Sequence, residues 1–156
     1  MRILLSLLLL AGMPAVWAPA SAQNAHPSFS IVITTDTPVV KAGSDVLIKV
    51  QMTNISHHEV DCTMAPSSGL DRKYQYDVRD SRGKPAVKVV RSHPELESGS
   101  IWPCTLEPGQ STPPNDNNIS RLYDFTRPGK DVIQVSRHDP KEGLAKSSKI
   151  TLTVEP

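Results

Sequence analysis

The segment SHHEVDCTM, residues 56–64, holds the densest group of side chains that could do chemistry. Imidazole nitrogens, carboxylates and sulfur atoms are the ligands that copper and zinc prefer in proteins. If the segment is a strand, however, His57, Glu59 and Asp61 lie on its outer face at steps of about 6.8 Å. Such a spacing does not bring three ligands to one ion, so the pattern favours a solvated strand end.

The other members of this segment occupy the opposite phase of the predicted strand. His58 and Met64 fall on the inward face of this strand together with Cys62, which we expect to form a disulfide. We therefore predict no metal ligand and no cofactor. Metal binding by His57, His58 and Met64 in a periplasmic protein stays open as an alternative function.

Cys62 and Cys104 are the two cysteines of the chain. In an oxidising compartment, two thiols in one small domain most simply form a disulfide. Such a bridge closes a loop of 43 residues, for which the chain-entropy model gives about 4 kcal/mol of stabilisation. A reactive thiol is the alternative, but it calls for a CxxC pair or an adjacent base, and the sequence has neither.

Catalytic motifs are absent from the sequence. There is no GxSxG elbow, no HExxH pair, no SxxK and no glycine-rich phosphate loop. None of the five histidines stands at a spacing that pairs a base with a nucleophile. We predict a protein that is not an enzyme and has no catalytic residues. The two sequons, at Asn54 and Asn118, are interpreted as loop asparagines.

The first 22 residues have the pattern of a signal peptide. Arg2 precedes an apolar run, and the small residues Ala20-Ser21-Ala22 follow it as a cleavage site. The run is much shorter than the roughly 20 residues that span a bilayer, so we expect no membrane insertion after its removal. The pattern predicts an exported protein, periplasmic or extracellular, whose mature chain begins at Gln23.

The mature chain, residues 23–156, has the size of one domain with a single core. It carries 16 basic and 16 acidic side chains, because the leader contains only Arg2. A chain without basic excess lacks the electrostatic footprint of a protein that binds nucleic acid or an anionic membrane surface. Both partner classes are therefore excluded.

Apolar residues in the mature chain recur at every second position, which places them on one face of an extended strand. Members of these alternating sets are Phe29, Ile31, Ile33, Val46, Ile48, Val50, Met52, Tyr74, Tyr76, Val78, Ile150, Leu152 and Val154. No stretch has helical periodicity. The pattern is typical of antiparallel sheets with one solvated face.

Counting these runs gives about seven or eight strands, which predicts an all-β, immunoglobulin-like antiparallel β-sandwich. The expected strands cover residues 29–35, 46–53, 59–64, 74–80, 86–90, 119–125, 131–137 and 149–155. Turns rich in Pro and Gly separate them. We expect Gly83, Gly109 and Gly129 to supply positive φ in such turns.

The stretch RLYDFTRPGKDVIQVSR, residues 121–137, is interpreted as strand, turn and strand around its Pro-Gly pair. Tyr123 and Phe125 are expected to point inward. Asp131 is spaced by two residues from Ile133 and Val135, so in an extended strand it falls on the same inward face. We place it at the first strand position, at the open end of the sandwich, because burying a lone carboxylate is costly. A functional acid there is the weaker interpretation.

The segments VKAGSDVLIKVQMTNIS, YDVRDSRGKP, LEPGQS and YDFTRPGKDVIQVSR resemble immunoglobulin-like domains of bacterial secreted proteins. The resemblance covers residues 29–155 and extends distantly to the intracellular proteinase inhibitor family of bacilli. It implies the sandwich fold and, for that family, binding of a protease through loops. Asp131 departs from the pattern, since this position is commonly aromatic in such domains.

Binding loops are the remaining candidates for function. They are RSHPELESGSIWPC (91–104), TPPNDNN (112–118) and HDPKEGLAKS (138–147). Trp102 is expected to pack against the disulfide rather than to anchor a ligand. We predict a non-catalytic exported module that binds an unknown protein or cell-envelope component through its end loops. The alternatives are a protease inhibitor and a metal-binding periplasmic protein.

Overall fold

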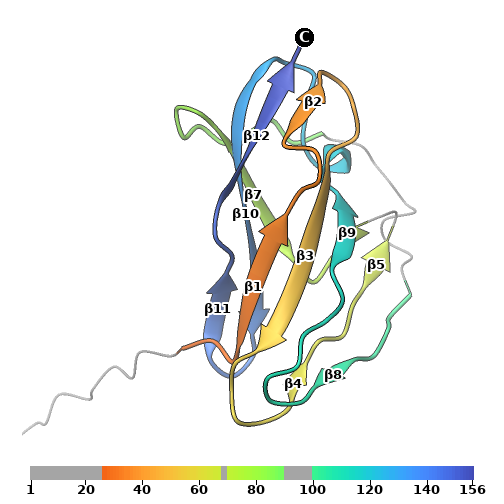
Figure 1. The fold of residues 1–156 in the computed structure, drawn as a ribbon, viewed down its shortest axis with the longest axis vertical. Helices are drawn as coiled ribbons and strands as arrows, with labels where there is room; N and C mark the ends of the chain where they lie inside the picture. Colours follow the sequence, from red (N-terminus) through yellow and green to blue (C-terminus); the bar gives the residue numbers. More distant parts are fainter. Residues whose placement is uncertain (1–25, 68–69, 90–99) are drawn as a thin grey trace, which may run out of the picture.

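The computed structural model describes residues 26–67, 70–89 and 100–156. These residues form twelve strands and one 3-10 turn, η2 (Ile119–Arg121), in an elongated molecule (Figure 1). Within these three ranges no helix has the length and apolar character that a membrane crossing requires. The predicted signal peptide, residues 1–22, lies outside the described residues.

One sheet has three strands in the order β1–β3–β9, all antiparallel. Its members are β1 (Phe29–Thr34), β3 (Leu47–Asn54) and β9 (Asn115–Asn118). Burial alternates along β3, because every second side chain faces the core. The prediction of alternating inward residues is confirmed here.

The second sheet is built around the longest strand, β10 (Gly129–Asp139). On one side β10 pairs with β7 (Gln75–Asp80), and on the other with β11 (Gly143–Lys146) and β12 (Ile150–Glu155). Outside them, β2 (Val39–Lys41) runs parallel to β12. This parallel pair departs from the all-antiparallel expectation.

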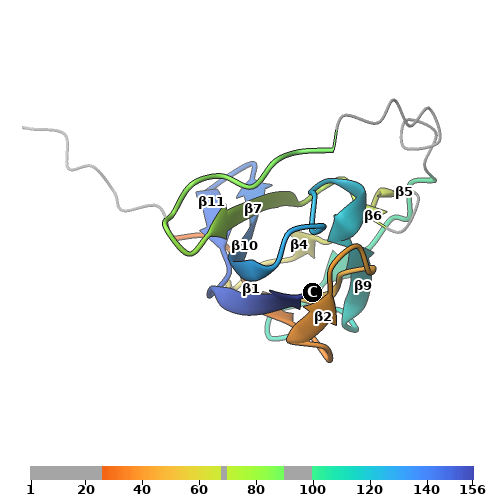
Figure 2. The ribbon, with the colours of Figure 1, turned by 90° about the horizontal axis from the view of Figure 1, so that it is seen from above.

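The two sheets pack face to face as an immunoglobulin-like β-sandwich of eight strands, which confirms the predicted fold class (Figure 2). Burial of their inward apolar side chains supplies the main stabilisation of such a fold. The core includes Phe29, Ile31, Ile33, Val46, Ile48, Val50, Met52, Val78, Ile119, Tyr123, Phe125, Ile133, Val135, Leu152 and Val154.

Two short ribbons complete the fold. One pairs β4 (Val60–Asp61) with β8 (Thr105–Leu106), and the other pairs β5 (Pro66–Ser67) with β6 (Leu70–Asp71). Cys62 and Cys104 extend the first ribbon, where the Cys62 amide donates to the Cys104 carbonyl. Their Cα atoms are 4.9 Å apart, within the range of disulfides.

Two predicted strands are wrong. Residues 119–125 begin as the turn η2 because the Asn118 side chain caps it by accepting from the Ser120 amide. The described part of 86–90 contributes only one isolated bridge, between Lys88 and Tyr123. Tyr123 and Phe125 are nevertheless buried as expected.

Two turn predictions also need correction. Gly83 and Gly109 have positive φ as expected, but Gly129 does not, since it is the first residue of β10 and pairs with Val154. Asp131 is therefore the third residue of its strand rather than the first. It is half-buried and lies opposite Asp80 of β7.

Candidate functional site

A cavity of about 590 Å³ in the described residues lies at one end of the sandwich. We call it the end cleft. There the start of β1, the β3–β4 turn and the β10–β11 turn come together, at the lower end of Figure 1. Its lining residues are Ser28, Phe29, His58, Glu59, Val60, Asp61, Arg72, Lys73, Gln75, Thr105, Arg137, His138, Asp139, Pro140 and Lys141.

Arg137 lies in the wall of the end cleft and closes the core at this end. It continues the inward face of β10 beyond Val135, and its side chain is only 6% exposed. The guanidinium lies over the rings of Phe29 and Tyr74, with its central carbon 6.0 and 5.5 Å from their centroids. Such cation–π contacts hold a desolvated arginine in place.

Only part of the Arg137 guanidinium is satisfied by hydrogen bonds. Its Nη2 donates to the carbonyls of Asp61 and Thr63, each at 3.2 Å. Its Nη1 is buried and makes no hydrogen bond of standard geometry, although the guanidinium lies near enough to the Tyr74 side chain to favour ionisation of its hydroxyl. The nearest carboxylate oxygen, on the exposed Asp61, is 4.0 Å from Nη2. A buried cation with an unmade hydrogen bond costs free energy and is rare in folded proteins.

Ser28 is the second residue of the end cleft with a buried polar atom outside standard hydrogen bonds. The residue is 2% exposed, and its Oγ makes no hydrogen bond of standard geometry, although its side chain lies near enough to the Asp139 carboxylate to help lower the pKa of that group. Its backbone amide donates to Asp139 Oδ2 at 2.8 Å, so the backbone position is fixed. Asp71 Oδ2 is the third such atom in the described residues, and it does not line the cleft. Two of the three buried atoms therefore belong to residues that line one cavity.

Charges of both signs line the end cleft. The cations are Arg72, Lys73, Arg137 and Lys141, and the carboxylates are Glu59, Asp61 and Asp139. Burial opposes ionisation of Asp139, but the amides of Lys141 and Ser28 donate to it and lower its pKa below the usual value. Asp139 is therefore an ionised structural acid that orders the β10–β11 turn.

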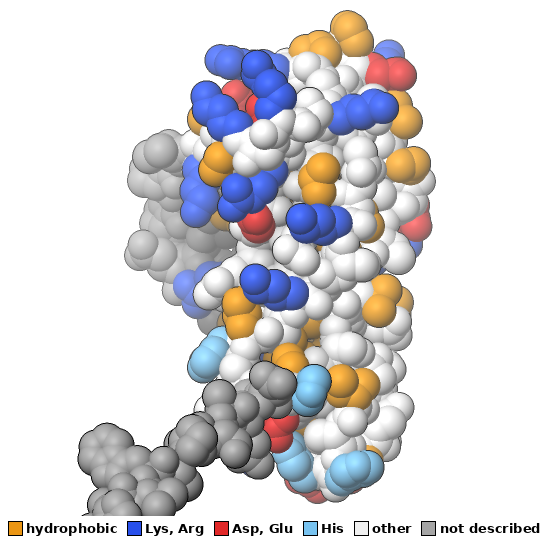
Figure 3. Space-filling view, turned by 90° about the vertical axis from the view of Figure 1, so that its left-hand side faces the viewer, with side chains coloured by type: hydrophobic (Ala, Val, Ile, Leu, Met, Phe, Trp, Pro, Cys, Tyr) orange, Lys and Arg blue, Asp and Glu red, His pale blue; other side chains and the backbone are white. Residues whose placement is uncertain are grey.

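Histidine side chains gather at this same end of the molecule (Figure 3). His57 and His58 lie in the β3–β4 turn, His138 near the end of β10 and His26 just before β1, and all four are exposed. His58 Nε2 is 3.9 Å from a carboxylate oxygen of Glu142. Across the described ranges, no three His, Cys, Asp or Glu side chains are placed to hold one metal ion.

The inward and outward directions predicted for the side chains of segment 56–64 are confirmed in part. Val60 and Cys62 are buried, whereas His57, Glu59 and Asp61 are exposed, as the alternating pattern predicted. His58 is also exposed, and this corrects its expected inner phase. The backbone there turns, because Ser56 Oγ bonds with the amide and carbonyl of His58 and so interrupts the extended chain.

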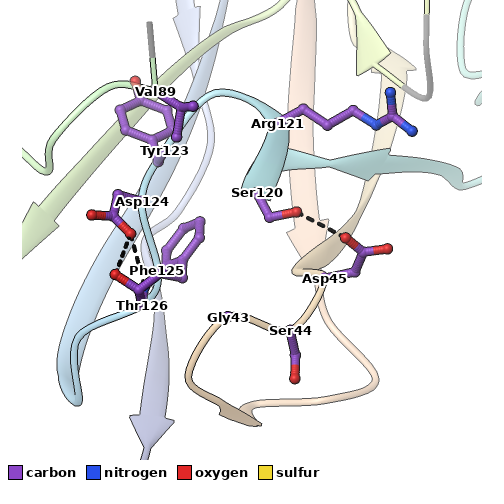
Figure 4. A pocket seen from close by; sticks show the side chains of 10 residues that line it. All are labelled: Gly43, Ser44, Asp45, Val89, Ser120, Arg121, Tyr123, Asp124, Phe125 and Thr126. Atoms are coloured by element: carbon purple, nitrogen blue, oxygen red, sulfur yellow. Dashed lines mark hydrogen bonds between the residues drawn. The ribbon is translucent and has the colours of Figure 1, made fainter. Parts of the chain in front are cut away.

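A second cavity, of about 380 Å³, lies between η2 and the turn before β3 (Figure 4). Two hydroxyl groups in its lining already have partners within the protein. Ser120 Oγ donates to Asp45 at 3.1 Å, and Thr126 Oγ donates to Asp124 at 2.6 Å. The end cleft is larger and has more charged side chains in its lining, so it is the stronger candidate.

The other predicted loops and side chains have mixed outcomes. Trp102 is 56% exposed, so the expected packing against the disulfide is wrong; its backbone pairs with Met64 at the ribbon edge. Segment 138–147 forms the β10–β11 hairpin beside the end cleft, and much of 112–118 is β9. Most of 91–104 lies outside the described residues.

The two sequon asparagines belong to the fold rather than to exposed loops. Asn54 is 1% exposed and Asn118 is 9% exposed. The Asn54 amide donates to the carbonyls of His58 and Leu106, and its Oδ1 accepts from the amide and hydroxyl of Ser56. Asn54 thereby holds the β3–β4 turn, which forms one wall of the end cleft.

Sequence reasoning missed Ser28 and Arg137. A signal for Arg137 was present, because it follows Ile133 and Val135 with the same parity and so belongs to the inward face. An arginine on an inward face needs partners for its charge, so this position could have been predicted as a candidate site residue. No local signal identifies Ser28, since its role depends on contact with a turn more than a hundred residues away.

The fold and the site define an immunoglobulin-like β-sandwich domain with a charged cleft at one end. No family model matches the chain, and no curated protein matches it, so the resemblance to the proteinase inhibitor family has no further support.

Two solved structures are similar in outline. One is the CARDB domain of a Pyrococcus furiosus protein in complex with di-metal ions, at 13% identity and a TM-score of 0.41, over 83% of this chain and 89% of that one. The other is a β-glucosidase of Erythrobacter marinus, at 15% identity and a TM-score of 0.43, over 81% of this chain and 16% of that one. Both are too distant to carry a function to this chain.

Proposed function

We propose that the chain is an exported, non-catalytic immunoglobulin-like module that binds a protein or cell-envelope partner through the end cleft. The observation that carries the proposal is the end cleft itself, a cavity of about 590 Å³ whose lining includes four cations and three carboxylates. A concave surface with charges of both signs can make ion pairs and hydrogen bonds with a bound partner. Loops and turns at the ends of a rigid sandwich are also common sites of binding.

Export is supported by the leader and by the cysteine pair. The leader, residues 1–22, has the charge, apolar run and small-residue site of a signal peptide. Cys62 and Cys104 lie in disulfide geometry, and disulfides persist mainly in oxidising compartments. The mature domain of the proposal is residues 23–156.

Site-specific photocrosslinking in the native envelope tests the proposed surface. A photoreactive residue in place of Lys141, on the rim of the end cleft, is expected to capture one partner of defined mass. The same residue in place of Arg82, in the β7 hairpin at the opposite end, is the control and should capture none. Equal capture from both positions, or from neither, would count against binding at this end.

A narrower form of the proposal is that the partner is a protease. The sequence resemblance to a proteinase inhibitor family is its only support. A panel of serine, cysteine, aspartic and metalloproteases, each assayed with micromolar mature protein, addresses it directly. If no protease shows slowed turnover, the partner belongs to another class.

Metal binding is a separate candidate, favoured by the exposed histidines at the same end. A metal that binds only the folded state must raise the melting temperature. We expect Zn²⁺ and Cu²⁺ to leave it unchanged, because the described residues place no three ligands together. A rise that disappears when His57, His58 and His138 are all replaced by alanine would establish a metal site instead.

A further inference from the structure

We propose that the end cleft binds an acidic peptide segment tightly when the histidines around it are protonated, and weakly when they are neutral. The inference rests on the proposed function, since it names the chemistry and the regulation of the partner that enters the same cleft. Two observations carry it. The described histidines gather at this end of the molecule, and one of them faces a carboxylate of a neighbouring turn.

All four histidines of the described residues lie at the end of the sandwich that holds the cleft (Figure 3). They are His26, His57, His58 and His138, and each is exposed. Histidine is the side chain whose ordinary ionisation falls between pH 5 and 8, so exposed imidazoles gain charge over this range. In the same view most lysine and arginine side chains lie over the upper half of the molecule, and their charge stays constant. Acidification therefore changes the charge of one end selectively.

The other charges at this end cancel, so the histidines decide its sign. The cations are Arg72, Lys73, Arg137 and Lys141, and the carboxylates are Glu59, Asp61 and Asp139 in the lining with Glu142 beside it. Four protonated imidazoles therefore turn a balanced end into one with a formal charge of +4. Burial opposes ionisation of Asp61 and Asp139, but hydrogen bonds from neighbouring groups lower the pKa of both below the usual value. These two acids stay ionised at pH 5, and the change in charge comes from the imidazoles.

His58 links the change in charge to the walls of the end cleft. Its Nδ1 lies 2.9 Å from the Glu59 carbonyl, which can only accept, so Nδ1 carries the proton of the neutral ring. Nε2 then directs a lone pair at Glu142, whose carboxylate oxygen is 3.9 Å away in the β10–β11 turn. Protonation replaces these two opposed acceptors with an ion pair. The pair connects the β3–β4 turn to the β10–β11 turn, and both turns line the cleft.

The lining of the end cleft favours a peptide with separated carboxylates as the anion. Its three carboxylates remain as fixed negative charges, so a densely charged phosphate polymer is repelled even at pH 5. A peptide can place its acidic side chains beside Lys73 and Lys141, and its backbone can pair with the exposed side chains of Gln75 and Thr105. A lipid surface is flat and reaches only the rim of a cavity of about 590 Å³.

Titration of the mature protein with two blocked peptides at pH 5 and pH 8, at equal ionic strength, tests the inference. One peptide alternates aspartate with alanine, and the other has asparagine in place of each aspartate. Changes in the amide NMR spectrum measure binding. Aspartate stays ionised at pH 5. We expect the acidic peptide to bind about tenfold more tightly at pH 5 than at pH 8, because exposed ion pairs are individually weak but four of them add. The asparagine peptide should bind at neither pH.

A fourfold variant, with His26, His57, His58 and His138 replaced by glutamine, removes the titrating charges. These side chains are exposed, so the variant should fold normally and bind the acidic peptide as the wild type does at pH 8, without the gain at pH 5. His58→Gln and His57→Gln form a matched pair, since each removes one exposed imidazole from the β3–β4 turn and His58 is the one that faces Glu142. His58→Gln should lose more of the gain; equal losses would overturn the role of the contact with Glu142.

Two results of the titration would overturn the inference as a whole. One is equal binding of the acidic peptide at pH 5 and pH 8, and the other is a gain at pH 5 that survives in the fourfold variant. Vesicles that contain phosphatidylglycerol test the other source of negative charge. If they bind at pH 5 and the acidic peptide does not, the assignment to a peptide is wrong.

The proposed function fails separately from this inference. If photocrosslinking from Lys141 captures the partner equally at pH 5 and pH 8, the partner site stands and its dependence on acid is wrong. If the acidic peptide binds with the expected pH dependence but Lys141 captures nothing at either pH, the cleft is an anion site and the proposed envelope partner is wrong.

Discussion

The ionised carboxylate of Asp131 destabilises the fold electrostatically. It lies directly across from Asp80 on the same face of the sheet. Burial, and after it the negative charge of Asp80, raises the pKa of Asp131. Asp80 itself stays ionised, because the amide of Lys84 donates to it and lowers its pKa. Two carboxylates in this arrangement oppose each other when both are ionised.

Replacing Asp131 by asparagine is expected to stabilise the protein at neutral pH. In the folded state the pKa of Asp131 lies above its unfolded value, so the native protein binds more protons between the two values. The contribution of Asp131 to stability is therefore complete below the unfolded pKa, and it is lost as pH rises through the folded pKa. At pH 7 the free energy of unfolding of Asp131→Asn should exceed that of the wild type by about 0.2–1 kcal/mol.

Urea denaturation of both proteins at pH 7 and pH 3 checks this prediction. The gain should shrink at pH 3, where Asp131 is largely protonated in the folded and the unfolded chain. Asp77→Asn is the matched control, because Asp77 pairs with Arg79 at 2.9 Å and should gain nothing from neutralisation. A gain of equal size at both pH values would show that charge is not the cause.

Asn54 is the residue on which the wall of the end cleft depends. Its side-chain nitrogen donates at 2.7 and 2.8 Å to the carbonyls of His58 and Leu106, and the first of these also accepts from Ser56 Oγ. We expect Asn54→Ala to lower the free energy of unfolding by about 2–4 kcal/mol, because each buried group left unpaired costs roughly 1–3 kcal/mol. Chemical denaturation measures it.

The variant Asn54→Asp isolates the role of the donors. It keeps the shape of the side chain and the acceptor for Ser56, but places a carboxylate oxygen against two carbonyls. Its loss of stability at pH 7 should be at least as large as that of the alanine variant. A milder effect of the aspartate would mean that the turn, and not the amide donors, holds this segment.

At the scale of elements, Gly83 and Gly129 differ in backbone conformation, although both follow similar turn sequences. Gly83 has φ of +79° in the hairpin after β7, whereas Gly129 is an ordinary strand residue, and neither has a neighbour that an added Cβ would meet. Gly83→Ala should therefore cost about 1–2 kcal/mol through backbone strain. Gly129→Ala should be neutral or stabilise by up to about 1 kcal/mol, because strand glycine is entropically unfavourable. Melting curves of the two variants, which add the same methyl group, provide the comparison; a similar cost at both sites would contradict it.

Alternation predicted the long strands because their burial is periodic. Phe29 to Ile33, Ile48 to Met52 and Ile133 to Val135 each alternate between core and solvent, and this pattern is visible without any tertiary information. The same logic missed β9, whose sequence NDNN has no apolar alternation. Its buried side chain of Asn117 is held by polar contacts, among them bonds with Asp71 and Tyr76.

The candidate site was the less predictable part, for two physical reasons. Ser28, His58 and Arg137 come together only through sheet pairing, and no local spacing encodes that meeting. Capping also overrides propensity: Asn118 starts a turn where the apolar residues Ile119 and Tyr123 suggested a strand. The end cleft follows from long-range contacts, whereas the fold class follows from period and turn chemistry.

At the scale of the whole molecule, the cysteine pair links the two halves of a short ribbon that lies outside the two main sheets. The β4–β8 ribbon has two residues in each strand, and the segment between its halves includes β5, β6 and β7. A link between Cys62 and Cys104 restricts this 43-residue loop in the unfolded chain. The chain-entropy model assigns about 4 kcal/mol to such a restriction, a large share of the roughly 5–15 kcal/mol typical of a domain.

Removing the link should therefore lower the stability of the mature protein substantially. We expect the double variant Cys62→Ala and Cys104→Ala to lose about 4 kcal/mol of unfolding free energy by urea denaturation. Dithiothreitol should destabilise the wild type by a similar amount and leave the double variant unchanged, which makes the variant its own control. Mass spectrometry of protein from the periplasmic fraction adds an independent readout, since it should show a chain that begins at Gln23 and carries no free thiol. Two thiols reacting in the native exported protein would overturn both the disulfide and the argument for stability that depends on it.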